Sequence, residues 1–474
     1  MKKILIFSLL LLGFYSCTED GLTSLNEDIK NPVAVEAGTL FANATVELFD
    51  WMTSTNVNQN NFRLWAQSWA QTTYADESNY ILNERNVNGG TWNKLYATVI
   101  RDLREAKTII AADVNLTDAG RKGQTAMADV LEIYAFHVLV DIFGDIPYSE
   151  ALSDDVTPAY DDDAAIYDDL LTRLDASVAN LSGSTWGDYD LIYGGNGDSW
   201  KKMANSLMLK LAIRIADTDD ARAKTLVETA IASGVMTSSA DNFTLVYENS
   251  TPNTNPLWEA LVQSGRSDFV AANTTTEVMN ALNDPRRSTY FSDLDPAGNA
   301  LGGAYGDNNS YSAFSHPGDM LKDPTLPASL VDYSEVSFLL ADAAARGYNV
   351  GSTEKDYYNN GVTASIEAWG GTSADAVTYL AQADVDYDTA PGTWREKIAL
   401  QKWLALYNRG FEGWSTYRVY DAPTMKVAVQ AGTTPPTRFT YPVTEYSLNG
   451  VNVNAANDAI GGDDLFTKVF WDAN

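Results

Sequence analysis

The stretch from Gln124 to Phe143 constrains the fold most, because it is apolar almost all the way round a helix. Only Asp129 and Glu132 form a thin polar strip along it. A helix with so little polar surface is stable only when other elements cover nearly all of it. Gly144 then ends the pattern. We therefore expect this helix at the centre of a mainly α-helical protein.

Further helical patterns occur on both sides of this segment. Trp92 to Ala112 carries apolar residues at a spacing that makes one continuous face. The remaining segments with helical periodicity are Ala164–Leu181, Ser199–Asp217, Asp220–Ser233, Asp332–Tyr348, Glu354–Trp369 and Trp394–Tyr407. Short polar turns join several of them, which favours stacked helical hairpins. No clean repeat of about 34 residues can be aligned to them, however.

Long irregular stretches separate these helices. Gly234 to Pro256, Leu282 to Ala328 and Asp421 to Phe466 are rich in Gly, Asn, Asp, Pro and aromatic residues. Loops of this length inside a compact domain usually carry function, and we expect them to bind the ligand and to contain minor β structure. No Pro/Ser/Gly linker divides the chain, so residues 32–474 are expected to form a single globular domain.

The N-terminus has the pattern of an exported lipoprotein. Within residues 1–16, two lysines precede an apolar run that is shorter than the about 20 residues of a membrane-spanning helix, which predicts a signal peptide. Cys17 is the only cysteine of the chain, so no intrachain disulfide can form. Its position predicts lipidation of its thiol, with residues 17–31 as a polar lipidated tether.

The chain offers few residues for metal or nucleophilic chemistry. It has only two histidines, and we expect His137, in the apolar helix, to be a core residue. A zinc site of several His and Cys ligands and a Cys-His nucleophilic pair are both excluded, and no phosphate-binding glycine loop occurs. The acidic run Asp161 to Asp163 fits a helix N-terminus better than a calcium site. We expect no metal site and no cofactor.

The charge balance narrows the partners. The chain carries a formal net charge of −31, which excludes nucleic acid as a partner. The 63 acidic residues guarantee many close carboxylate pairs, so any one pair says little about glycoside hydrolysis. A surface glycoside hydrolase is therefore kept only as a minor alternative, to be tested by release of reducing sugar.

Aromatic residues are the main positive sign of a binding function. The chain has 12 Trp and 25 Tyr, and sugars bind by laying their apolar faces on such rings while amides and carboxylates hold the hydroxyls. The first candidate cluster comprises Trp65, Trp69, Tyr74, Asp76, Asn79 and Tyr80. The second, in the longest loop, comprises Tyr290, Tyr305, Asn308 and Tyr311. Trp65 and Trp69 would share one helical face, either packed in the core or presented to ligand.

Several segments in sequence order carry a family resemblance. They are Asn26–Pro32, Trp69–Tyr80, Asp141–Leu152, Gln401–Tyr407, Gly410–Trp414 and Arg438–Tyr446. With the lipoprotein start, they resemble the SusD/RagB family of outer-membrane nutrient-binding lipoproteins, particularly its SusD-like branch. Arg418-Val419 departs from the arginine pair that the family often has there.

The resemblance implies both a fold and a role. The fold would be helical, with tetratricopeptide-like hairpins on one side and ligand-binding loops on the other. The role would be that of a lid that faces the cell exterior, captures an oligosaccharide and passes it to a SusC-like TonB-dependent transporter without catalysis. Capture of a peptide or another organic nutrient is the alternative, and a lid without its own affinity is a further one. The motifs imply no individual binding residue.

Overall fold

The structure, a computed structural model, describes residues 35–183 and 186–473. The predicted signal peptide (1–16), Cys17 and the 17–31 tether lie outside the described residues. The α-helices are α3 (Ala37–Thr53), α4 (Phe62–Trp65), α5 (Val87–Lys94), α6 (Arg101–Ala112), α7 (Asp118–Phe143), α8 (Asp163–Asn180), α9 (Gly197–Arg214), α10 (Asp220–Ser233), α11 (Pro256–Trp258), α12 (Asn273–Ala281), α13 (Arg287–Tyr290), α14 (Tyr333–Ala345), α15 (Glu354–Ala368), α16 (Ser373–Leu380), α17 (Trp394–Ala405), α18 (Gly410–Tyr420), α19 (Val443–Leu448) and α20 (Gly450–Ala459). The predicted mainly α fold is confirmed.

The strands are short and pair only in twos. They are β1 (Trp69–Gln71), β2 (Phe243–Leu245), β3 (Phe269–Ala271), β4 (Phe291–Ser292), β5 (His316–Pro317) and β6 (Ala328–Val331). Within the described residues, the pairs are β1–β3, β2–β6 and β4–β5, all antiparallel. Of these strands, β2, β4 and β5 lie within the long loops, as expected. The pairs β1–β3 and β2–β6 join segments far apart in sequence, whereas β4 and β5 belong to the same loop.

The central helix α7 has the predicted position. Every residue from Val130 to Phe143 is buried, and the helix ends before Gly144, whose φ of 78° L side chains rarely adopt. Its N-terminus lies earlier than expected, because the Thr117 hydroxyl accepts a hydrogen bond from the Gly120 N–H and caps a polar first turn. Burial on all sides thus explains the lack of a polar face.

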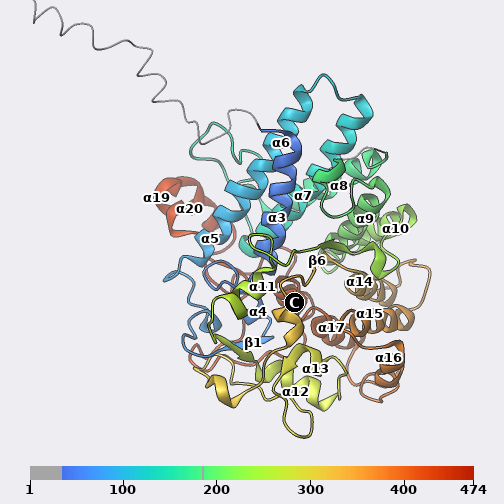
Figure 1. Ribbon diagram of the computed structural model, residues 1–474. Coiled ribbons are helices and arrows are strands. Elements are labelled where there is room, and N and C mark those ends of the chain that lie inside the picture. Colours follow the sequence, from blue (N-terminus) through green and yellow to red (C-terminus); the bar gives the residue numbers. More distant parts are fainter. Residues whose placement is uncertain (1–34, 184–185, 474) are drawn as a thin grey trace, which may run out of the picture.

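Antiparallel helix pairs surround α7. It packs on α6 and α8, while α9 packs on α10, α14 on α15 and α17 on α18. In Figure 1, α8–α10 and α14–α17 gather on the right, whereas α12 and α13 lie below α17 at the bottom, with β1 to their left. One cluster of buried apolar side chains extends from Phe41 to Trp471 across these parts. Hairpins and loops therefore share one core.

Two local predictions are wrong. Trp65 and Trp69 do not share a helix: α4 ends at Trp65, Gln67 turns the chain with a φ of 56°, and Trp69 begins β1. The stretch Asp421 to Phe466 is not irregular throughout, because it contains α19 and α20. Both helices are short and polar, so they lack the apolar periodicity that identifies a helix in sequence.

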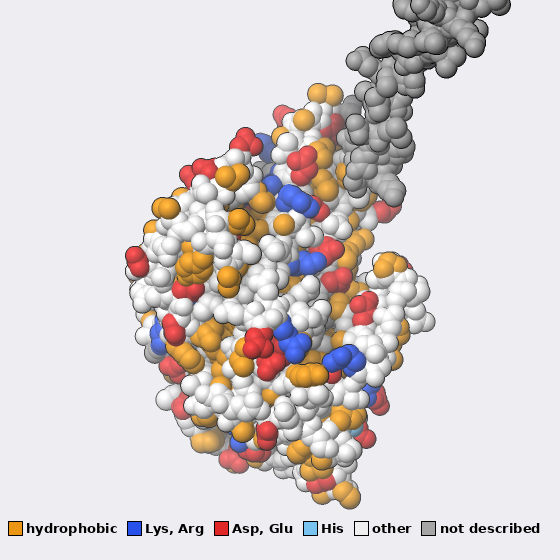
Figure 2. Space-filling view, turned by 90° about the vertical axis from the view of Figure 1, so that its left-hand side faces the viewer, with side chains coloured by type: hydrophobic (Ala, Val, Ile, Leu, Met, Phe, Trp, Pro, Cys, Tyr) orange, Lys and Arg blue, Asp and Glu red, His pale blue; other side chains and the backbone are white. Residues whose placement is uncertain are grey.

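Side chains of both charges lie on the face of the molecule that Figure 2 shows. Figure 2 shows Asp and Glu side chains scattered over one face, several of them beside Lys or Arg. In the part of the chain that the structure describes, no helix combines the length and apolar character needed to cross a membrane.

A buried ionic cluster ties α9, α14 and α18 together. Glu412 accepts hydrogen bonds from Lys210 Nζ at 2.8 Å and from Arg214 Nη2 at 2.9 Å. Glu335 lies 3.1 Å from Lys210 Nζ and accepts from Arg409 Nη1 at 2.9 Å. The Lys210, Arg214, Glu335 and Glu412 side chains are at most 5% exposed. Opposite charges therefore balance one another within the core.

Acid is expected to destabilise the chain through His137. This residue is fully buried against the rings of Tyr134 and Phe411. Burial lowers its pKa from 6.5 to about 4, although the nearby carboxylates of Asp141 and Glu412 oppose this shift. Below pH 6.5 the unfolded chain gains a proton that the folded chain does not. About 3 kcal/mol of stability is therefore lost as the pH falls to about 4. Urea denaturation between pH 4 and pH 7 measures this loss. His137→Met should flatten the profile, and an unchanged pH dependence in that variant would contradict the assignment.

Candidate functional site

The two candidate clusters of the sequence lie in neighbouring loops. Trp69 of β1 pairs with Ala271 of β3, and the Ala271 N–H donates to the Ser315 carbonyl at 2.8 Å. The segment around Trp69–Tyr80 and the loop around Tyr305–Tyr311 therefore meet across β3. Figure 1 places β1 to the left of α12 and α13. We name the exposed side chains of Tyr74, Asn308 and Tyr311, together with the half-buried Asp76, the loop face.

Buried amide side chains hold these loops together. Asn309 Nδ2 donates to the Gln71 carbonyl at 3.0 Å. Asn79 Nδ2 donates to the Gly306 carbonyl at 2.9 Å, while its Oδ1 accepts from the Ala431 N–H at 2.9 Å. Asn79, a predicted ligand contact, is only 8% exposed, so it connects three segments of the chain instead of facing solvent. The loop backbones are thus fixed without regular secondary structure.

Five of the predicted binding rings lie in the core. Trp65, Trp69, Tyr80, Tyr290 and Tyr305 are each at most 5% exposed. Trp69 Nε1 donates to the Tyr407 hydroxyl at 2.6 Å, and the Tyr290 ring stacks on Tyr407 with centroids 4.0 Å apart. Such rings present no free face to a ligand in this conformation. What they do is anchor the loops that carry the exposed residues.

Tyr74 and Tyr311 are the exposed rings of the predicted set. Tyr74 is 59% exposed, with the guanidinium of Arg85 5.7 Å from its ring centroid. Asp76 is half-buried and lies 3.7 Å from Arg85, and Asn308 is exposed. Tyr74 and Asp76 thus both lie beside one guanidinium, and a flat ring near a carboxylate is a combination that suits a sugar.

Tyr311 is held in place by a histidine. Its ring stacks on His316 with centroids 3.7 Å apart and planes within 9°. His316 Nε2 donates to the Tyr311 carbonyl at 2.7 Å, and Nδ1 lies 2.6 Å from an Asp293 carboxylate oxygen. The outer face of Tyr311 therefore has a fixed orientation.

The surface near Tyr74 is shallow. Tyr74, Arg85, Arg266 and Asp268 line a hollow of about 30 Å³, enough for about one water molecule. Arg266 Nη2 donates to Asp268 at 2.9 Å. A ligand on the loop face would therefore lie along the surface, as an extended oligosaccharide can.

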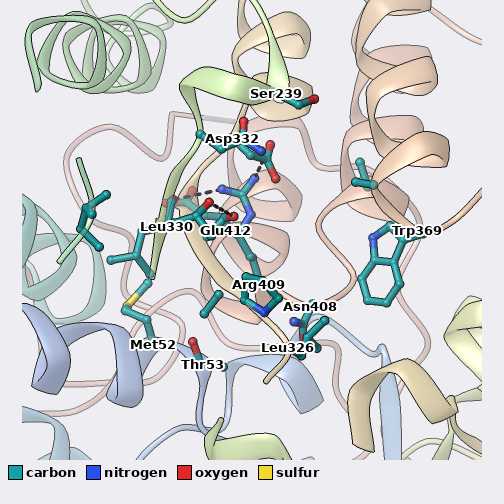
Figure 3. Close-up of a pocket in the computed structure, with 18 of the residues that line it drawn as sticks. Met52, Thr53, Ser239, Leu326, Leu330, Asp332, Trp369, Asn408, Arg409 and Glu412 are labelled. Atoms are coloured by element: carbon teal, nitrogen blue, oxygen red, sulfur yellow. Dashed lines mark hydrogen bonds and ion pairs between the residues drawn. The ribbon is translucent and has the colours of Figure 1, made fainter. Parts of the chain in front are cut away.

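A much larger cavity lies deeper in the molecule. Its volume is about 490 Å³. Its wall comes from the end of α3, the β2–β6 ladder, the end of α15 and the α17–α18 junction. Figure 3 shows Trp369 on one side, with Asp332 above and Asn408 below the guanidinium of Arg409. The sequence analysis did not identify this cavity, because its lining comes from helix ends that are distant in sequence.

Three carboxylates near the start of α8 lie close together. One oxygen each of Asp145, Asp162 and Asp163 falls within 4.8 Å of the others. Asp162 caps α8 by accepting from the Ala165 N–H, so the expected helix N-terminus is confirmed. Asp145 accepts from the Asp163 N–H at 3.0 Å. Burial raises the pKa of Asp145 to about 6 and that of Asp163 to about 7. Capping and backbone hydrogen bonds thus account for this cluster.

Comparison with known families decides the identity. The sequence profile described as "Starch-binding associating with outer membrane", SusD-like, matches residues 29–442. The chain belongs to the SusD-like family. The predicted family is thereby confirmed, and with it the combination of helical hairpins and irregular loops. The description of this family names two properties, starch binding and association with the outer membrane. Among curated protein sequences, none matches the chain.

Solved SusD-like structures are similar over almost the whole chain. A chitin-binding SusD homolog from Flavobacterium johnsoniae is 27% identical, with a TM-score of 0.78 over 92% of this chain and 98% of its own. A SusD homolog from Bacteroides uniformis is 26% identical, with a TM-score of 0.78 over 92% and 99%. A chitin-binding protein is 25% identical, with a TM-score of 0.79 over 93% and 100%.

Proposed function

We propose that this SusD-like protein captures an oligosaccharide at the cell surface. The observation that carries the proposal is the pair of exposed rings, Tyr74 and Tyr311, that anchored loops hold beside polar side chains. The starch-binding description of the family and the chitin-binding function of two similar structures support a glycan as the ligand. The proposed role needs no catalytic group and no cofactor.

Glycan binding is expected to depend on the two rings. In calorimetric titrations of the chain that follows Cys17, chito-oligosaccharides or malto-oligosaccharides should produce heat. Tyr74→Ala and Tyr311→Ala should each weaken binding about 5- to 30-fold, since one ring contributes about 1–2 kcal/mol at a binding hot spot.

Tyr446→Ala is a matched control, because Tyr446 on α19 is 36% exposed, as Tyr311 is. If Tyr74→Ala and Tyr311→Ala bind the glycan as tightly as Tyr446→Ala and the wild type do, the site does not lie on the loop face. Heat with a peptide digest and none with any glycan would favour the alternative, capture of peptides or another organic nutrient.

The cellular part of the proposal concerns anchoring and delivery. Lipidation of Cys17 would attach the protein to the outer membrane, facing the cell exterior, and a SusC-like TonB-dependent transporter would receive the glycan. The membrane association in the family description supports this placement. Cys17→Ala should release the protein from the membrane fraction, and the wild type should co-purify with an outer-membrane barrel after mild detergent extraction. A Cys17→Ala variant that stays in the membrane fraction would refute the lipid anchor. A wild type that co-purifies with no barrel would refute the transporter partnership.

A further inference from the structure

The cavity of about 490 Å³ beside Trp369 and Arg409 is separate from the loop face and has the size of a small-ligand site. Ser239, Ala240 and Pro327 are exposed at its rim, whereas Tyr134 and Leu330 are buried in its wall. None of the loop-face residues lines it. Pockets of about 300–1,000 Å³ hold small molecules, and about 490 Å³ suits a short ligand better than a long chain.

Trp369 gives the cavity a flat apolar wall. Its ring is half-buried, and one side meets the edge of Tyr290, with centroids 4.6 Å apart and planes at 70°. The residue is the C-cap of α15, where its N–H donates to the Ser365 and Ile366 carbonyls at 3.2 Å. Gly370, with a φ of 82°, then turns the chain away. The helix end therefore fixes the ring in the orientation that Figure 3 shows.

Uncharged donors and one carboxylate complete the wall. Asp332 Oδ1 accepts from the Glu335 N–H at 2.8 Å and from Arg409 Nη2 at 3.2 Å. Among the described residues, Asp332 Oδ2, Asn408 Nδ2 and Trp369 Nε1 have no hydrogen-bond partner. An acceptor and two donors are thus available on different sides of the cavity, as Figure 3 shows for their side chains.

The charge of the cavity opposes an anionic ligand. The guanidinium of Arg409 bonds to Glu335 at 2.9 Å and to Asp332, so both of its charged neighbours are acidic. Glu412 is balanced by Lys210 and Arg214. No positive charge among the described lining residues is left without a carboxylate. A ligand rich in neutral hydroxyls fits this lining, because it can donate to Asp332 and accept from the amide.

We propose that this cavity is a second saccharide site, which takes a neutral mono- or disaccharide between Trp369, Asp332 and Asn408. The ligand class follows from the lining and agrees with the proposed glycan capture, on which the biological meaning of the site rests. A sugar ring lies on Trp369, its hydroxyls donate to Asp332 Oδ2, and Asn408 Nδ2 donates to a ring or hydroxyl oxygen.

Titrations with N,N′-diacetylchitobiose, maltose and galacturonic acid test the site. The wild type should bind a neutral disaccharide, and binding should quench or shift the tryptophan fluorescence. It should bind galacturonic acid at least about 10-fold more weakly. Ala240→Trp narrows the exposed rim without touching the core and should abolish disaccharide binding. Asp332→Asn should weaken it about 10-fold while keeping the N-cap of α14, since asparagine caps as well as aspartate.

The double variant Tyr74→Ala/Tyr311→Ala separates the two sites. Disaccharide binding that this variant retains, and that Ala240→Trp loses, supports an independent cavity site. Disaccharide binding unchanged in both Ala240→Trp and Asp332→Asn, or absent in the wild type, overturns the cavity site. If long oligosaccharides still require Tyr74 and Tyr311 in that case, the proposed function stands and only this inference fails.

Discussion

Replacing Glu412 by glutamine is expected to destabilise the folded chain by about 3–5 kcal/mol, the usual effect of breaking a buried ion pair from one side. The substitution leaves Lys210 and Arg214 charged, buried and without their shared carboxylate. Burial opposes ionisation of Glu412, but these two cations outweigh it and hold the pKa of its carboxyl well below the usual range. Urea denaturation followed by circular dichroism at pH 7 measures the loss.

Glu412→Asp is the matched control, because it keeps the charge and only shortens the side chain. It should lose distinctly less stability than Glu412→Gln. If the two variants are equally stable, packing and not charge sets the role of this residue. If Glu412→Gln is as stable as the wild type, the cluster is not closed to water in solution.

Trp65→Ala is expected to have a comparable effect on stability, about 3–5 kcal/mol, as large-to-small substitutions of buried aromatic residues do. Trp65 is completely buried and contacts Tyr80, Trp414 and Phe439, with ring centroids 4.8–5.7 Å apart. Its Nε1 donates to the Glu77 carbonyl at 3.1 Å. Urea denaturation measures the loss, and glycan titration below the unfolding transition should give wild-type affinity.

Tyr74→Ala provides the contrast, since its ring is 59% exposed. Its stability should change by no more than about 0.5 kcal/mol while glycan affinity falls. A Trp65→Ala variant that stays fully stable but loses glycan binding would show that the ring turns outward when ligand is present, as the sequence pattern allowed.

Helical periodicity predicted most of the scaffold. The helix expected at Asp220–Ser233 has these bounds in the structure, and the one expected from Glu354 ends one residue early, at Ala368. These helices carry local signals that need no tertiary information. In α10, the Asp219 side chain accepts from the Arg222 N–H, and in α15 Thr353 and Asp356 form a capping box.

Helices α3 and α18 were missed for a different reason. Neither has a side-chain N-cap, and Gly410 and Gly413 make α18 resemble a turn in sequence. Gly410 stands there because of tertiary packing: a Cβ would lie 2.3 Å from the Arg63 backbone nitrogen. Only the fold, which brings α18 against α4, explains such a glycine.

The candidate site was predicted as a composition but not as a geometry. The sequence identifies loops rich in rings and amides, yet it cannot separate Tyr74, which is exposed, from Tyr80, which is 5% exposed. The burial of Tyr80 depends on partners such as Thr433, which is far away in the chain and whose carbonyl accepts from the Tyr80 hydroxyl at 3.5 Å. The cavity was missed for the same reason, although Trp369-Gly370-Gly371 at a helix end is a local signal that an analysis of helix C-termini could find.

The contacts between the two ends of the chain also govern the order in which it can fold. Arg63 donates to the Asn408 carbonyl at 3.0 Å, and the Phe439 N–H donates to the Ile142 carbonyl at 2.8 Å. The rings around Phe62 therefore remain open to water until residues near 439 have been synthesised. Such distant contacts slow folding, because the entropy of closing long loops must be overcome before they form. The helical hairpins, whose contacts are local, can form before this last closure, whereas the ring cluster around Phe62 and Phe439 is completed only at the end of synthesis.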